Sequence, residues 1–230
     1  MLHTTVRRAT TVARTARFVQ FCGKFDLPVE PTSVREWAAD VELPPDWSVG
    51  VIVGPSMAGK TTLANELFPG ELVEQGHWAW PADRFIGDGF PAALSVDEIA
   101  GLLSSVGFSS PPDWLKPYAA LSNGGKFRVD LARTLAERPA RAVVDEFGSL
   151  VHARARQVAA AAAAKAVRRR GGQLVALLVH DDAVDHFEPD WVIRVRPGER
   201  VTADAVRGSL RRPPIELKVV AAHPSAWELF

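Results

Sequence analysis

Short apolar runs alternate along this chain with stretches in which apolar residues recur every three or four positions. Runs rich in Val, Ile and Leu, each four to eight residues long, are typical of strands buried on both faces of a sheet. The longer periodic stretches between them are typical of helices that pack one face on a core. This alternation predicts an α/β fold with a mostly parallel sheet and helices on both of its faces. The expected strands lie at residues 37–43, 49–53, 141–146, 173–179 and 191–196, and the expected helices at 62–68, 96–106, from 123 onward and at 153–170.

Several of these boundaries carry recognisable end signals. Ser95 with Glu98 three residues later forms a capping-box pattern, and Ser122 is a good N-cap residue. The helix at 153–170 has arginines in its last turn and two glycines after it, as helix C-termini favour. Asp88-Gly89 indicates a turn.

The N-terminal stretch, residues 1–24, holds five basic side chains and no acidic one. Its apolar positions do not separate helix from strand. It is either a basic arm that touches nucleic acid or a protein partner, or an edge strand with solvated arginines, and the second interpretation is favoured. Arg168, Arg169 and Arg170 are the other residues that could add to a local nucleic-acid patch.

We expect one domain over residues 1–230, with three peripheral regions. These are an N-terminal β region at about 1–48, a reduced helical or insert region at about 71–120, and a C-terminal extension at about 197–230. The last includes Pro213-Pro214, an alternating stretch at 215–219 and an apolar end from Trp227 to Phe230.

Composition excludes several classes of protein. Hydrophobic residues make up 47% of 230 residues, enough for a core. Lys plus Arg and Asp plus Glu both number 27, so no overall field attracts nucleic acid or membranes. Cys22 is the only cysteine, which excludes an intramolecular disulfide and favours a reducing, cytoplasmic location. The sequence has no apolar run long enough for a membrane span, and direct membrane insertion is not expected.

A glycine-rich segment directly after the strand at 49–53 fits the phosphate-loop pattern G-x-x-x-x-G-K-[ST] at every required position. A helix follows it, and this strand–loop–helix context is what anion binding requires. Backbone N–H groups of the loop point inward, and the helix N-terminus adds partial positive charge. We expect this segment to bind the phosphates of a nucleotide through Gly54, Pro55, Ser56, Met57, Ala58, Gly59, Lys60, Thr61 and Thr62.

Three further motifs follow in order. A glycine-rich helix start, Leu121-Ser122-Asn123-Gly124-Gly125, resembles a second phosphate-facing element. The strand at 141–146 ends in the paired carboxylates Asp145 and Glu146, and the strand at 173–179 is followed by His180. Strand ends of an open α/β sheet are where ligands bind. His180 alone is most simply an ordinary histidine, and its place in this order favours a functional role.

Together, these four motifs in this order resemble the nucleotide-binding domain of ABC-type ATPases: the phosphate loop, the Leu-Ser-x-Gly helix start, the strand with Asp-Glu and the strand with His. The resemblance runs from about Phe25 to Arg196, and residues 121–133 match the family's signature stretch without a gap. It implies a P-loop NTPase fold with a mostly parallel central sheet and flanking helices, an added antiparallel β region at the N-terminus and a short helical subdomain.

The resemblance also implies roles for individual residues, with ATP and Mg²⁺ as cofactors. Lys60 would contact the β- and γ-phosphates, while Thr61 and Asp145 would hold Mg²⁺. Glu146 would act as general base toward the attacking water, and His180 would contact the γ-phosphate. Ser122 and Gly124 would close over the ATP of a second copy in a head-to-tail dimer. Phe25 is the candidate aromatic for stacking on adenine, and a plain core role for it is nearly as well supported.

The sequence departs from the family pattern at several positions. Met57 and Ala58 stand where glycine and serine are common, Asn123 and Gly125 alter the signature, and Phe147 and His152 replace a proline and an aspartate. The glutamine usually found between the phosphate loop and the signature is not identified, because Gln75 lies too early and Asp88 lies nearer the expected place. These departures bear on coupling between the two sites of a dimer.

One subgroup is similar in further detail: bacterial and phage ABC ATPases often fused to an acetyltransferase-like domain. The shared features are Asp145-Glu146-Phe147, residues 121–124 and residues 211–215. We expect the ATPase part alone, with an acetyltransferase-like or other protein as a partner. The leading hypothesis is an ATP hydrolase that dimerises around Mg-ATP and drives a process other than transport. The alternatives are an ATP-gated binding or regulatory module with little turnover, and the ATPase subunit of a membrane transporter.

Overall fold

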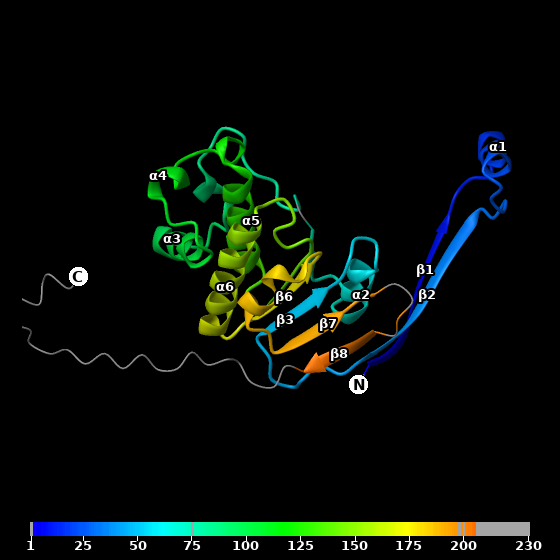
Figure 1. Cartoon of the computed structure of the whole chain (residues 1–230). Helices are drawn as coiled ribbons and strands as arrows, with labels where there is room; N and C mark the ends of the chain where they lie inside the picture. Colours follow the sequence, from blue (N-terminus) through cyan, green and yellow to red (C-terminus); the bar gives the residue numbers. More distant parts are fainter. Residues whose placement is uncertain (1, 75, 197–198, 200, 206–230) are drawn as a thin grey trace, which may run out of the picture.

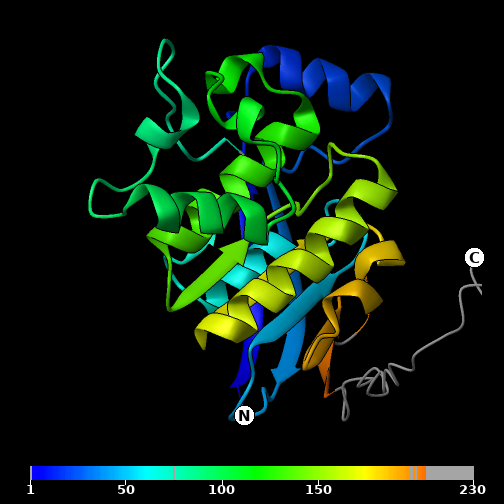
Figure 2. The same cartoon turned by 90° about the vertical axis from the view of Figure 1, so that its left-hand side faces the viewer.

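A single mixed sheet runs through the molecule, and helices cover both of its faces (Figures 1 and 2). The computed structural model describes residues 2–74, 76–196, 199 and 201–205. Within these residues the sheet has eight strands in the order β1-β2-β8-β7-β3-β6-β5-β4. The strands are β1 Leu2–Thr11, β2 Thr32–Val41, β3 Val49–Val53, β4 Leu72–Val73, β5 Arg141–Val144, β6 Gln173–Leu178, β7 Trp191–Arg194 and β8 Val201–Ala205.

Five of these strands form the parallel centre. β3 pairs in parallel with β6 and with β7, β6 pairs with β5, and β5 pairs with β4. The carboxyl ends of all five therefore lie at one edge of the sheet, where the loops that follow them meet. The α/β class, the mostly parallel sheet and the antiparallel N-terminal region, in which β1 pairs with β2, are all confirmed.

The residues of β3 are all buried and alternate between two cores, as the period of a strand requires. Val49, Val51 and Val53 face the core made with α5 Asn123–Glu137 and α6 Ala153–Arg170. Ile52 faces the second core, where α2 Lys60–Leu67 packs.

Helix α6 contacts the sheet mainly through alanine side chains. Ala159, Ala160 and Ala163 have no exposed surface, and their small side chains let the helix approach the strands closely. The helix ends at Arg170, and Gly171 follows in the left-handed conformation with a φ of 69°. The expected bounds and C-cap of this helix are confirmed.

The region between β4 and α5 contains the expected helical subdomain (Figure 1). Its main helix, α3 Val96–Ser105, begins with the expected capping box of Ser95 and Glu98. Asp88-Gly89, expected to form a turn, lies in a short 3₁₀ helix. The elements are 3₁₀ helix η1 Ile86–Gly89, α3 Val96–Ser105, α4 Pro111–Trp114 and η2 Tyr118–Ala120; after β6 come the 3₁₀ helices η3 Asp181–Ala183 and η4 Asp185–Phe187.

The ends of the chain differ most from expectation. The sequence did not decide between helix and strand for residues 1–24, and the structure has both. Strand β1 is followed by α1 Ala16–Lys24, whose N-cap Thr15 accepts a hydrogen bond from the Phe18 N–H at 3.2 Å. Strand β8 was not predicted, although it lies inside the sheet between β2 and β7. The features expected at 211–230 lie outside the described residues. No helix in the described part is long and apolar enough to cross a membrane.

Candidate functional site

The loop between β3 and α2 owes its shape to two glycines. A Cβ on Gly54 would lie 2.2 Å from the backbone oxygen of Val195, so no side chain fits there. Gly59, the residue before α2, has a φ of 103°, which L side chains rarely adopt. Met57 adopts a φ of 64° and leaves its side chain 83% exposed. The departure from glycine at Met57 therefore keeps the loop conformation at the cost of some backbone strain.

Lys60 lies at the start of α2 with its side chain turned back along the loop. Its ammonium group donates to the backbone oxygens of Gly54 at 2.8 Å and of Pro55 at 2.9 Å. Burial lowers the pKa of Lys60, and the charges of Asp145 and Glu146 oppose this shift. The first N–H groups of α2 have no partner within the helix. Ammonium group and N–H groups together form a site for an anion.

Thr61 and Asp145 meet beside this loop. The Thr61 hydroxyl donates to Asp145 Oδ2 at 2.8 Å, although the two residues are 84 positions apart. Mg²⁺ prefers oxygen ligands and usually keeps several waters, so one carboxylate and one hydroxyl beside a phosphate site suit it. No cluster of three or more His, Cys, Asp or Glu side chains in the described residues could hold a metal ion without such help. The residues present fit a magnesium ion that shares its ligands with a bound phosphate.

Asp145 and Glu146 follow β5 at the carboxyl edge of the sheet. The Asp145 N–H donates to the Val73 oxygen and the Phe147 N–H to the Leu177 oxygen, both at 2.9 Å, which fixes the backbone on either side of Glu146. Glu146 itself is exposed and has a φ of 46°. Such a conformation in a residue other than glycine is uncommon and is often found where function fixes the backbone. The Glu146 carboxylate accepts a hydrogen bond from the Ser149 hydroxyl at 3.4 Å and is exposed, so a bound molecule can reach it.

His180 comes two residues after the end of β6. Leu178 pairs with Val53, and its oxygen accepts the Gly54 N–H at 3.1 Å, so His180 follows the strand next to the phosphate loop. Its side chain is exposed. The structure thus brings Lys60, Thr61, Asp145, Glu146 and His180 to one edge of three adjacent strands.

Arg156 links the segments that follow Glu146 and His180, and the sequence analysis missed it. Its guanidinium group is buried and donates to both carboxylate oxygens of Asp182, at 3.2 Å and 2.6 Å. It also donates to the backbone oxygens of Gly148 at 3.0 Å and Val151 at 3.4 Å. Arg156 holds the pKa of Asp182 below its usual range. An arginine at helical spacing from Ala159, Ala160 and Ala163, which face the core, was the signal that could have identified it.

Ser122 and Gly124 begin α5. The Ser122 side chain accepts the Gly125 N–H at 3.2 Å, so the expected N-cap is confirmed, and Ser122 remains exposed. Gly124 is partly exposed at the same corner. The corner is therefore open to a second molecule.

Phe25 is not brought to the phosphate loop of its own chain. It is the C-cap residue of α1, and Figure 1 shows α1 at the far end of the β1–β2 ribbon, well away from α2. There its ring lies 5.6 Å from that of Phe21 and is 57% exposed. The structure thus supports neither a core role for Phe25 nor stacking on adenine bound to the same chain.

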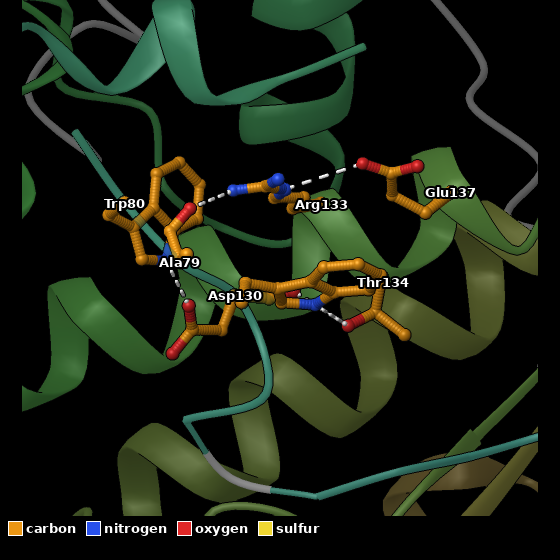
Figure 3. A network of polar contacts seen from close by, with 7 residues as sticks. Ala79, Trp80, Asp130, Arg133, Thr134 and Glu137 are labelled. Atoms are coloured by element: carbon orange, nitrogen blue, oxygen red, sulfur yellow. Dashed lines mark hydrogen bonds and ion pairs between the residues drawn. The ribbon is translucent and has the colours of Figure 1, made fainter.

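Trp78 and Trp80 join the segment after β4 to α5 through hydrogen bonds and do not form a ligand cage (Figure 3). Trp78 Nε1 donates to the Thr134 hydroxyl at 2.9 Å, and Trp80 Nε1 donates to Asp130 Oδ1 at 2.7 Å. Arg133 donates to the Ala79 oxygen at 2.8 Å and lies over both indole rings. The interpretation of these tryptophans as packing residues fits this network.

A small cavity of about 40 Å³ lies between this segment and the paired carboxylates. Asp145, Glu146, Glu74 and Gly76 all contribute to its lining. Gln75 lies outside the described residues. Asp88, the alternative position, lies in η1 of the helical subdomain and is absent from the lining.

No protein-family model matches this sequence, and no curated protein matches it significantly. Solved structures do match. The dimeric structure of a bacterial ABC transporter cassette is 16% identical, with a TM-score of 0.56 over 76% of this chain and 93% of that chain. The same cassette in a post-hydrolysis state bound to ADP and Pi gives 14% identity and a TM-score of 0.56 over 76% of this chain and 93% of that chain.

A Clostridium perfringens protein, part of the ABC transporter complex cbiONQ, gives 18% identity and a TM-score of 0.53 over 67% of this chain and 75% of that chain. At these identities the likeness shows the fold. The chain therefore has the fold of ABC ATP-binding cassettes.

Proposed function

We propose that this protein is an ABC-type ATPase that binds Mg-ATP at residues 54–62 and hydrolyses it in a head-to-tail dimer. The observation that carries the proposal is the Thr61–Asp145 hydrogen bond of 2.8 Å beside the buried Lys60 ammonium group. A chance glycine turn would not join the hydroxyl in the first turn of the following helix to a carboxylate 84 residues away, at the same edge of the sheet. The fold shared with ABC cassettes supports the same conclusion.

Each residue of the site has a distinct task. The N–H groups of the loop and the Lys60 ammonium group bind the β- and γ-phosphates, and Thr61 and Asp145 hold the magnesium ion, which supplies positive charge to the phosphates when bound. Glu146 accepts a proton from the attacking water, which its exposed carboxylate can reach. His180 orients the γ-phosphate and the water.

Two copies are needed to complete the site. Ser122 and Gly124 lie at an exposed helix start, where N–H groups and the helix dipole favour an anion. Placed over the phosphate loop of a second copy, this corner would contact the γ-phosphate from the opposite side. A neighbour in fold has been solved as a dimer, which supports this arrangement.

Phosphate release from Mg-ATP tests the proposal, with the parent compared with Glu146→Gln. The parent should release phosphate well above a control without enzyme, and the variant should not. Equal rates in parent and variant would remove Glu146 from its role. No turnover in the parent would favour the second candidate, an ATP-gated binding module, which the departures at Gly125 and His152 support.

The process that ATP drives stays a proposal. The reduced helical region favours a role other than transport, whereas a subunit of a membrane transporter is the alternative that the similar structures suggest. An acetyltransferase-like partner rests only on the residues 145–147, 121–124 and 211–215. Of the basic residues considered for nucleic acid, Arg168 already donates to the backbone oxygens of Phe187 and Glu188. Retention on DNA that falls steeply with salt would support a nucleic-acid role.

A further inference from the structure

The connection between β1 and β2, residues 12–31, carries an unusual number of exposed apolar side chains; we call it the tip. It contains α1 and stands off from the sheet at the end of the two-stranded ribbon (Figure 1). Phe21 is 60% exposed, Phe25 57% and Leu27 58%. The rings of Phe21 and Phe25 lie 5.6 Å apart, and exposed apolar side chains grouped in this way mark an interaction site. The apolar side chains concerned are Val12, Val19, Phe21, Phe25, Leu27 and Val29.

Strand directions place the tip on the nucleotide side of the sheet. β1 is antiparallel to β2, β2 is parallel to β8, β8 is antiparallel to β7, and β7 is parallel to β3. β1 therefore runs in the same sense as β3, and both end at the edge that carries the phosphate loop. The tip extends from the edge at which a second copy would bind.

The register shows how far the tip reaches. Asp40 pairs with Thr202, whose neighbour Ala203 pairs with Ile193, and Ile193 pairs with Ile52. Asp40 is thus level with the end of β3. The eight residues of β2 from Thr32 to Ala39 lie beyond that level, which corresponds to about 25 Å of ribbon.

An apolar groove of about 400 Å³ lies on the helical subdomain. Val96, Leu115 and Phe85 are 81%, 73% and 42% exposed within it. Residues 81–117, which surround it, hold five acidic and two basic side chains, whereas the tip holds three basic and two acidic ones. Both surfaces are apolar, and the segments that form them are opposite in net charge. We call this second surface the groove. Its apolar lining includes Phe85, Val96, Ile99, Leu103, Trp114 and Leu115, of which Phe85, Val96 and Leu115 are exposed and Leu103 is buried.

We propose that the tip of each copy packs into the groove of the other copy when two chains close around ATP. This inference rests on the proposed head-to-tail dimer. In that dimer the phosphate loop, near the middle of the sheet, faces the Ser122 corner, so the second copy has its sheet order reversed. The β1 edge of one copy then lies beside the helical subdomain of the other. The tip does not reach the groove of its own copy, because the β1 and β4 edges are seven strand spacings apart, about 34 Å.

The contact would be made twice in a symmetric dimer. It would add apolar area to an interface that otherwise consists of polar loops around the nucleotide. A stable association usually buries more than about 1,000 Å² with an apolar centre. The tip and the groove supply that centre.

The test is a double-mutant cycle on the dimer formed by the Glu146→Gln protein with Mg-ATP, followed by sedimentation. Phe21→Ser in the tip and Leu115→Ser in the groove should each raise the dimer Kd about tenfold, as truncation of a well-packed interface residue does. Both changes together should raise it by clearly less than the product, because the two residues share one contact. Val158→Ser, at an exposed position on α6, is the matched control and should leave the Kd unchanged.

The outcomes separate this inference from the proposed function. If the Glu146→Gln protein stays monomeric with Mg-ATP, the proposed dimer fails, and the inference fails with it. If it dimerises and the tip variant has the parent Kd, the inference alone is overturned. If Phe21→Ser instead abolishes binding to vesicles of anionic lipid and leaves the dimer Kd unchanged, the tip binds membranes, and the inference is again overturned.

Discussion

Replacing Arg156 with alanine should damage both stability and turnover, because this one side chain joins the segment after Glu146 to the segment after His180. The change removes four hydrogen bonds: two to Asp182 and one each to the Gly148 and Val151 oxygens. Asp182 is partly exposed and regains water, so its ion pair counts for about 1 kcal/mol. The two bonds to backbone oxygens contribute about 1 kcal/mol each.

The expected loss is therefore about 2–3 kcal/mol in the free energy of unfolding. For a chain of this length that corresponds to a fall in Tm of roughly 5–10 °C. In the proposed mechanism Glu146 and His180 act mainly in the transition state, so kcat should fall at least about tenfold while the Kd for ATP changes by less than about threefold.

Thermal unfolding and steady-state phosphate release, with a nucleotide titration, measure these three quantities. Arg154→Ala is the matched control, because Arg154 is exposed on the same helix two positions earlier. Arg156→Lys keeps the charge but loses the planar fork, and it should restore only part of both properties. A protein with Arg156→Ala that has the parent Tm and kcat would refute the assignment of Arg156 as the link between the two segments.

Three further predictions concern the loop, the metal and the dependence on pH. Gly54→Ala should abolish measurable ATP binding in calorimetry, because its Cβ would lie 2.2 Å from the Val195 oxygen; parent affinity would contradict the loop geometry. Thr61→Ala should raise the Mg²⁺ concentration for half-maximal phosphate release at least about tenfold, because Asp145 loses its partner in holding the ion; an unchanged requirement would exclude this role. Asp182→Asn should lower the Tm, and the difference in Tm between parent and variant should be largest at pH 7 and disappear as the pH falls below about 4. The reason is that the Arg156 guanidinium group depresses the pKa of Asp182 in the folded state. A constant difference in Tm from pH 7 to pH 3 would exclude the ion pair.

The motifs were predictable from sequence because each is local. Local pattern alone defines the phosphate loop, the N-cap at Ser122 and the buried strand that precedes Asp145. Since strands of this kind are parallel, their carboxyl ends meet, and the grouping of Lys60, Asp145 and His180 follows from the order of the elements.

The peripheral parts were not predictable, because pairing between distant segments decides them. β8 has no strong strand signal and forms between β2 and β7, strands at least 150 positions apart in sequence. Helix α1 was not predicted, because its basic residues are as compatible with an extended basic arm as with a helix. Phe25 was the candidate for adenine because the resembled family has a stacking aromatic upstream of the loop, but the long β1–β2 pairing places Phe25 at the far end of the ribbon.

The hydrogen bonds that buried polar side chains make between distant segments were likewise not predictable from local sequence patterns. Arg156 reads as one arginine among several on a helix, and only its contacts with Asp182 and two backbone oxygens show that it holds the site together. Similarly, Asp130 joins Trp80 and Tyr118 from different segments, and burial raises its pKa.

The sedimentation of the Glu146→Gln protein with and without Mg-ATP tests the central proposal most directly. A carboxamide in place of the proposed base should leave ATP bound but unhydrolysed between two copies. We therefore expect a monomer without nucleotide and a dimer of twice the mass with Mg-ATP. A single mass under both conditions, with ATP shown to be bound, would contradict the account of a nucleotide held between Lys60 of one chain and Ser122 of the next.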